Sequence, residues 1–173
     1  MMDAGRSFSG NERNCFFINL GNGKFADISG LSGLDFPDDG RAISVTDWDN
    51  DGDLDLWITN RNAPRLRLMR NDTKEVNSFI SLRLSGNGKT VNKDAIGARI
   101  EIINGNDSGK FKQIKTLRAG QGFLSQSSKW IQFALNETIK SINIKISWPD
   151  GTVSKIEDVL PNKKYIIRQE NSS

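Results

Sequence analysis

The sequence predicts an all-β chain, and three observations support that prediction. Short segments alternate apolar and polar residues, as in residues 80–84, 98–102, 131–135 and 142–148. Such alternation places one side of a strand against a core and the other side in water. Glycine-rich turn signals separate these segments, and no segment has the period of a long amphipathic helix. Many short strands with regular turns favour a sandwich or a similar antiparallel architecture.

The expected turns contain residues that accept positive φ angles. They lie at residues 21–23 and 86–88, at Asn104-Gly105, and at residues 149–151, where proline presets φ before Asp150-Gly151. We therefore expect hairpins or tight turns at these four places.

The alternation also predicts which side chains are buried. The expected core of the second half comprises Ile80, Leu82, Leu84, Ile100, Ile102, Phe133, Ile144 and Ile146. The same pattern assigns Trp48, Trp57, Trp130 and Trp148 to packing positions, in preference to a sugar-stacking platform. Cys15, which precedes two phenylalanines, is expected to be a buried strand residue.

The distribution of charge divides the chain into two units. Residues 1–72 hold 8 Lys and Arg against 12 Asp and Glu, whereas residues 73–173 hold 16 against 9. The sign changes near the polar stretch at residues 71–77, so we expect one unit at residues 12–71 and another at residues 77–170. The basic residues of the second unit are scattered along alternating strands, which indicates a solvated face; nucleic acid is not the expected partner.

The composition of this 173-residue chain excludes several classes of function. There is no histidine, which excludes a serine-type triad, and the single cysteine excludes a zinc cluster. No run approaches the length of a membrane span. The first six residues lack the apolar stretch of an export signal, so we expect a cytoplasmic chain, or a fragment or mature form whose signal is missing.

The most informative segment is Asp47-Trp48-Asp49-Asn50-Asp51-Gly52-Asp53-Leu54-Asp55. Carboxylates at loop positions 1, 3, 5 and 9 converge when the backbone curls around a point, and Gly52 permits the sharp turn. Hard oxygen ligands in this number suit calcium, and five aspartates so close together would repel one another without a cation. We expect Asp47, Asp49, Asp51 and Asp55 to bind Ca²⁺ with their carboxylates and Asp53 with its carbonyl.

Two other interpretations of this loop are less favoured. An EF-hand requires a glutamate at position 12 and flanking helices, but position 12 is Ile58 and the flanks are strand-like. A glycan hydrolase would use two of the aspartates as an acid and a base, which competes with their use as metal ligands.

The loop and its flanks resemble a known repeat. The Asp-x-Asp-x-Asp-Gly-x-x-Asp pattern, the preceding residues 16–28 and the following residues 65–71 are similar to the FG-GAP/VCBS repeat, a blade of β-propellers. The second half resembles the ASPIC/UnbV domain at residues 94–99, 120–128 and 148–151. That domain follows such repeats in the cartilage acidic protein family and its bacterial relatives. The resemblance implies a partial propeller-like sheet followed by an antiparallel sandwich-like domain, in an extracellular or periplasmic setting.

Together these observations predict a non-enzymatic, calcium-binding module that binds a protein or a glycan, with calcium in a structural role. The alternatives are a polyanion-binding module that uses the basic half and, less favoured, the hydrolase. One blade cannot close a propeller ring, so we expect the first unit to pack against the second, against another copy of the chain, or against missing blades.

Overall fold

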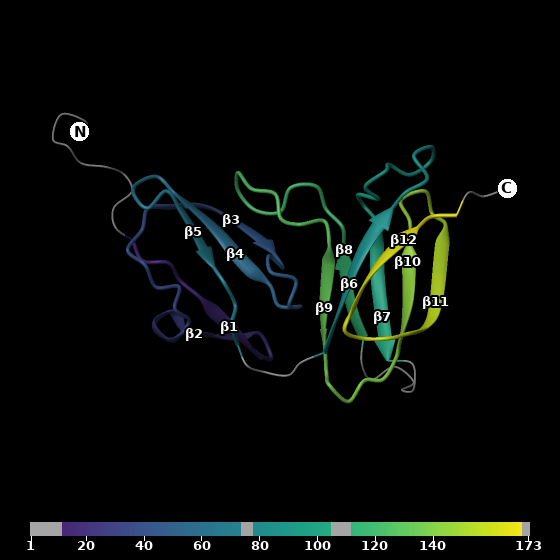
Figure 1. The fold of residues 1–173 in the computed structure, drawn as a ribbon, viewed down its shortest axis with the longest axis horizontal. Coiled ribbons are helices and arrows are strands. Elements are labelled where there is room, and N and C mark those ends of the chain that lie inside the picture. The colour runs from purple at the N-terminus through teal and green to yellow at the C-terminus, as the bar shows by residue number, and fades with distance from the viewer. Residues whose placement is uncertain (1–11, 74–77, 105–111, 171–173) are drawn as a thin grey trace.

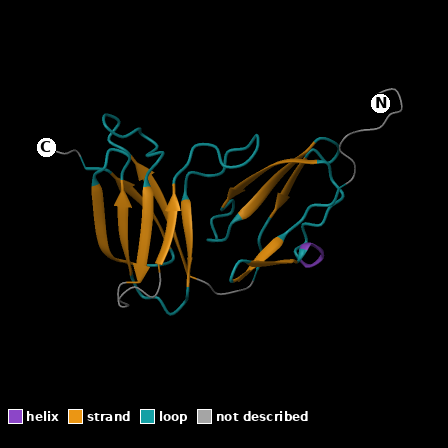
Figure 2. Cartoon of the chain, turned by 180° about the vertical axis from the view of Figure 1, so that it is seen from behind, coloured by secondary structure: helices purple, strands orange, loops and turns teal. Residues whose placement is uncertain are grey.

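The computed structural model describes residues 12–73, 78–104 and 112–170, and it confirms the all-β class (Figure 1). Within these residues the chain forms twelve strands and one short 3-10 turn, Ser29–Leu31 (Figure 2). No helix in the described part is long and apolar enough to cross a membrane.

The first half contains a hairpin and a small antiparallel sheet. The hairpin pairs β1 (Phe17–Gly21) with β2 (Lys24–Asp27). The sheet has the order β3-β4-β5, with β3 at Gly40–Thr46, β4 at Asp55–Asn60 and β5 at Leu66–Met69. The expected turn at residues 21–23 joins β1 and β2, and its residues have φ angles of 85°, 53° and 73°.

The second half is a sandwich of two sheets. One sheet has the order β11-β10-β7-β8, and the other has the order β12-β6-β9. The bounds are β6 Ser78–Ser85, β7 Arg99–Asn104, β8 Lys112–Thr116, β9 Ile131–Leu135, β10 Ile142–Ser147, β11 Val153–Val159 and β12 Lys163–Arg168.

One pair of strands departs from the expected antiparallel architecture. β6 is antiparallel to β9 but parallel to β12. The alternation within a strand shows which face is buried, but it carries no information about the direction of a neighbour that is distant in sequence. The antiparallel interpretation is therefore correct for the other pairs of this half and wrong for this one.

The core lies between the two sheets of the second half. All eight expected core residues belong to one buried cluster, to which both sheets contribute. Trp148 completes this cluster, and its indole N–H donates to Ser154 Oγ at 2.8 Å. The turn at residues 149–151 is also confirmed, because Gly151 has φ +87° and its N–H donates to the Trp148 carbonyl.

Four other expectations have different outcomes. Cys15 is exposed and precedes β1, because it lies in an irregular segment on the surface of the small first half. Residues 86–88 begin a tight turn, because Gly88 has φ +73° and its N–H donates to the Val91 carbonyl. They do not form a hairpin between adjacent strands, since β6 and β7 belong to different sheets. The turn at Asn104-Gly105 lies outside the described residues. Trp48 is 57% exposed and packs edge-to-face against Trp57.

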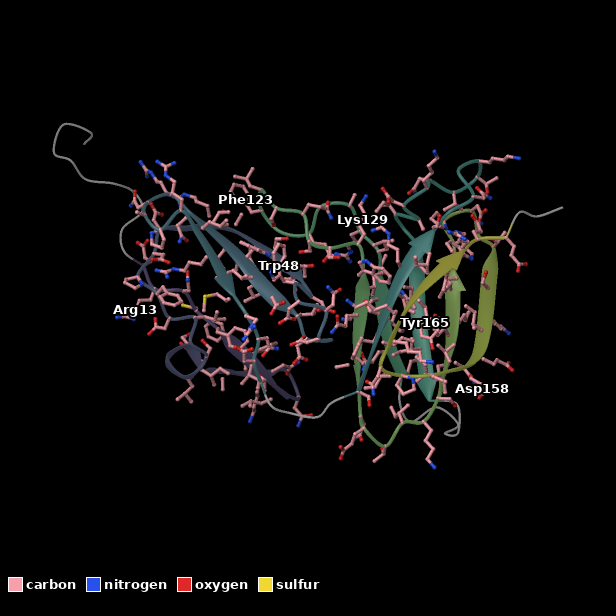
Figure 3. The ribbon with its side chains drawn as sticks, in the orientation of Figure 1. Arg13, Trp48, Phe123, Lys129, Asp158 and Tyr165 are labelled. Carbon is pink, nitrogen blue, oxygen red and sulfur yellow. The ribbon has the colours of Figure 1, made fainter. Side chains whose placement is uncertain are left out.

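The connection between β8 and β9 links the two halves. It extends from the sandwich toward β3, and Phe123 is exposed on this connection (Figures 1 and 3). Ser44 Oγ donates to the Gln126 carbonyl at 2.8 Å, and the Ser128 N–H donates to the Val45 carbonyl at 3.0 Å. The Val45 N–H donates to Ser127 Oγ at 3.1 Å. These bonds hold β3 against the connection.

Candidate metal centre

The aspartate-rich loop joins β3 to β4, as the sequence predicts. Thr46 pairs with Asp55 at the base of the loop, so the backbone must reverse within residues 47–54. Asn50 has φ +66° and Gly52 has φ +100°, and both lie in the left-handed region that a sharp reversal requires. The loop therefore projects from the end of the β3-β4 hairpin.

The reversal gathers three of the five expected residues. One carboxylate oxygen from each of Asp47, Asp49 and Asp55 lies within 4.8 Å of the others. Asp51 lies outside this group, and its Oδ1 accepts the Asp53 N–H at 2.8 Å. The carboxylate of Asp53 is also outside the group.

Asp55 shapes the loop through hydrogen bonds. It is 1% exposed, and its Oδ2 accepts the Trp48 N–H at 2.7 Å while its Oδ1 accepts the Asn71 N–H at 2.9 Å. One carboxylate therefore ties the start of the loop and the segment after β5 to β4. Each of its oxygens keeps a second lone pair that can face a cation.

Asp47 has the most unusual environment in the group. Its side chain is 8% exposed, yet neither of its oxygens accepts a hydrogen bond from any described residue. Lys164 Nζ lies 2.8 Å from Asp47 Oδ2 as an ion-pair partner, and it donates to Asn50 Oδ1 at 2.6 Å. A buried carboxylate without a hydrogen bond costs free energy unless a cation compensates for it.

The loop is crowded with negative charge. Burial and the neighbouring carboxylates of Asp51, Asp47, Asp55 and Asp49 raise the pKa of the Asp53 carboxyl. Arg70 Nη1 lies 3.8 Å from Asp49 Oδ2, but Arg70 also binds Asp72. Mutual repulsion of this kind is what a divalent cation relieves.

The loop rests on the outer face of the β12-β6-β9 sheet. Ser81 of β6 pairs with Gln132 of β9 on one side and with Lys164 of β12 on the other, so these three residues form one row across the sheet. Gln132 Nε2 donates to the Gly52 carbonyl, and Lys164 contacts Asp47 and Asn50. This row joins the loop to the sandwich.

The ring of Phe79 on β6 also lies close to Gly52 of the loop. Sequence reasoning did not identify Gln132, Lys164 or Phe79 as neighbours of the loop. The alternation of residues 131–135 places Gln132 on the outer face of β9, which is a usable signal. Nothing in the local pattern shows that the loop covers this face, because the contact joins residues far apart in the chain.

Comparison with protein families finds a match within the second half. Residues 88–173 match the family model described as ASPIC and UnbV. The comparison with curated proteins found no match.

Proposed function

Taking residues 88–173 as an ASPIC and UnbV domain, we propose that the chain is a non-enzymatic, calcium-binding β module. It binds a protein or a glycan at the cell surface or in the periplasm. Asp47, Asp49 and Asp55 hold the ion, with Asp51 and the Asp53 carbonyl completing the oxygen ligands. The ion has a structural role: it neutralises the loop and thereby fixes how the first half meets the sandwich.

The observation that carries this proposal is the state of Asp47. Its nearly buried carboxylate accepts no hydrogen bond from the described residues, and its ion-pair partner is the single ammonium of Lys164. Two other carboxylates lie in the same group, so the loop gathers more negative charge than Lys164 can balance. The donor set consists of oxygen atoms, which are the ligands that calcium prefers, without the nitrogen or sulfur ligands that favour zinc. The residues present therefore fit calcium.

The same contacts support a structural role. Gln132 and Lys164 connect the loop directly to the sandwich. An ion that stiffens the loop would also stiffen this junction. Both oxygens of Asp55 accept hydrogen bonds from backbone N–H groups. A carboxylate fixed in this way is better suited to bind a metal ion than to act as an acid or base that exchanges protons.

Calorimetric titration and thermal unfolding test the proposal. If the site resembles extracellular calcium modules, Kd is on the order of 0.1–1 mM. Calcium at ten times Kd then stabilises the chain by about 1.4 kcal/mol, and the melting temperature rises by about 2–4 °C. Asp47→Asn should abolish this rise, whereas Glu157→Gln, on exposed β11, should keep it. Equal melting temperatures in excess EDTA and in ~5 mM calcium would refute the proposal.

A further inference from the structure

A cavity of about 770 Å³ lies where the two halves meet, next to β8. Val45 and Leu54, on either side of the aspartate loop, contribute from the first half. The other walls come from the sandwich and from the connection between β8 and β9: residues 114–118, 120–122, 127–128 and 130–132, with Arg99. A cavity at the junction of two units is a common position for a binding site.

The charged residues that line this cavity are all basic. Arg99, Lys115 and Arg118 line it, and none of its described lining residues is acidic. Arg118 forms no ion pair with any described residue, and Arg99 Nε lies 3.7 Å from its nearest carboxylate, Glu101 Oε1. Burial lowers the pKa of the Lys115 ammonium. An anionic ligand would compensate for these charges.

The cavity also contains a free strand edge. β8 is the last strand of its sheet and pairs only with β7 among the described strands. The Leu117 N–H donates to the Ala98 carbonyl on the β7 side. Because backbone groups alternate in direction along an antiparallel strand, Ile114 and Thr116 direct their N–H and C=O groups away from β7. Both residues line the cavity.

Side chains close to this edge bond elsewhere and not to those backbone groups. Gln113 Nε2 donates to the Ala134 carbonyl at 2.7 Å, and Lys115 Nζ donates to the Gln132 carbonyl at 2.5 Å. These two residues occupy the alternate positions and connect β8 to β9 through their side chains. They do not satisfy the outward backbone groups of Ile114 and Thr116.

We infer that an extended, acidic peptide segment of a partner protein binds in this cavity by adding a strand to the free edge of β8. Its backbone pairs with Ile114 and Thr116, and its carboxylates at alternate positions lie beside Arg99 and Arg118. Residues between them contact the apolar wall that Val45, Leu54 and Trp130 provide. Strand addition of this kind obtains affinity from the backbone and selectivity from alternate side chains.

The positive charges on and next to β8 favour an acidic partner segment over a second copy of the chain. A second copy of β8 would bring Lys115 and Arg118 next to like charges, which disfavours pairing between copies. An acidic segment would instead place negative charges next to these basic side chains. The inference rests on the proposed function as a binding module and narrows its partner to a protein, whereas calcium binding is a separate property of the aspartate loop.

A strand-edge variant tests the inference. The probe is a short peptide of alternating glutamate and valine, titrated into the full chain in ~5 mM calcium and in EDTA. Thr116→Pro removes the outward N–H and should weaken binding about tenfold or more, while Thr116→Val keeps the N–H and should bind as the wild type does. Proline is tolerated at strand edges, and a melting curve verifies that the variant folds.

Charge variants and hydrogen exchange give independent readouts. Arg118→Glu should weaken binding about tenfold, whereas Lys155→Glu, the same charge change on exposed β11 at the opposite edge of this sheet, should not. The peptide should slow exchange of the Ile114 and Thr116 amides. If those amides stay unprotected, or Thr116→Pro binds normally, the inference is wrong.

Binding measurements with other ligands also test the inference. Binding of a heparin-derived oligosaccharide without binding of the peptide would overturn the inference in favour of a glycan. Absence of peptide binding together with a normal calcium-induced rise in melting temperature would refute the inference and leave the calcium site intact. Peptide binding without any calcium-induced rise in melting temperature would support the inference and refute the calcium site.

Discussion

Lys164 Nζ on β12 lies 2.8 Å from Asp47 Oδ2 in the loop that follows β3, so a cation of the sandwich reaches the buried carboxylate of the other half. Lys164 also donates to Asn50 of the same loop. In the absence of metal, this ammonium supplies the positive charge that Asp47 requires. It therefore stabilises the loop and competes with a bound ion for the same carboxylate.

Removing the lysine charge should strengthen calcium binding. Lys164→Met eliminates a positive charge close to the site, and we expect calcium affinity to rise on the order of fivefold, equivalent to about 1 kcal/mol. The metal-free chain should melt at a lower temperature, because Asp47 loses its partner. Calorimetric titration measures the first effect and thermal unfolding in EDTA the second. Lys163→Met, one residue away on an exposed position, should change neither; weaker calcium binding by Lys164→Met would contradict the competition.

The contact between Gly52 and Phe79 should be intolerant of substitution. A Cβ at Gly52 would lie 2.3 Å from the Phe79 ring, and the φ of +100° adds strain. Gly52→Ala should destabilise the chain by about 2–4 kcal/mol. Gly33→Ala is the matched control, because Gly33 has φ +72° and no atoms within 4 Å of its added Cβ. It should cost only about 1 kcal/mol. Chemical unfolding compares the two, and equal losses would mean that the ring moves aside without cost.

Asp150 should make stability sensitive to acid. Donation from the Thr90 and Thr152 hydroxyls, the Thr152 N–H and the Gln169 amide holds the pKa of this carboxyl well below its ordinary value. A depressed folded-state pKa gives stability that is present above the unfolded pKa of about 3.9 and is lost as the pH falls below it.

The variant Asp150→Asn isolates this contribution. Its melting temperature should be lower than that of the wild type at pH 7, and the gap should narrow as the pH falls from about 5 to 3. Glu157→Gln serves as the control on exposed β11 and should follow the wild-type curve. A gap that stays constant over this range would show that the network does not depend on ionised Asp150.

Local patterns predicted the sandwich core well, and particular residues show why other features could not be predicted from the sequence. Ile144 and Ile146 alternate with polar residues between two sheets, so a period of two is sufficient to predict their burial. The position of the loop was likewise predictable, because Gly52 and the aspartates encode the reversal themselves. The parallel pairing of β12 with β6 and the contact of Lys164 with Asp47 depend on which distant segments meet. Trp130 fits a packing position by its pattern, but it lines the cavity between the halves.

The second half should fold without the first. Its core cluster draws every buried member from residues 80–159, and both sheets are complete within residues 78–168. A fragment of residues 77–170 should therefore unfold in one cooperative thermal transition. Its melting temperature should be lower than that of the full chain, since the fragment lacks the loop that covers Phe79, Ser81 and Gln132. A broad, non-cooperative melt would contradict this.

The first half, by contrast, should require a partner. Among the described residues with buried apolar side chains, Ile58 alone comes from this half. Its exposed apolar side chains include Phe17, Leu20, Phe25, Leu31 and Leu66, from 53% to 88% exposed. Exposed apolar surface of this extent and an unpaired sheet edge favour association.

We expect the isolated full chain to self-associate through this surface. Light scattering after gel filtration should show a mass that rises with protein concentration. Leu20→Ser combined with Phe25→Ser should restore the monomer, because these substitutions remove apolar area without affecting the sandwich core. Val153→Ser on β11, also exposed, should leave association unchanged. A concentration-independent monomer whose residues 12–71 show slow amide exchange, comparable to that of the sandwich, would mean that contacts within the chain are sufficient, since slow exchange reports a stably folded unit.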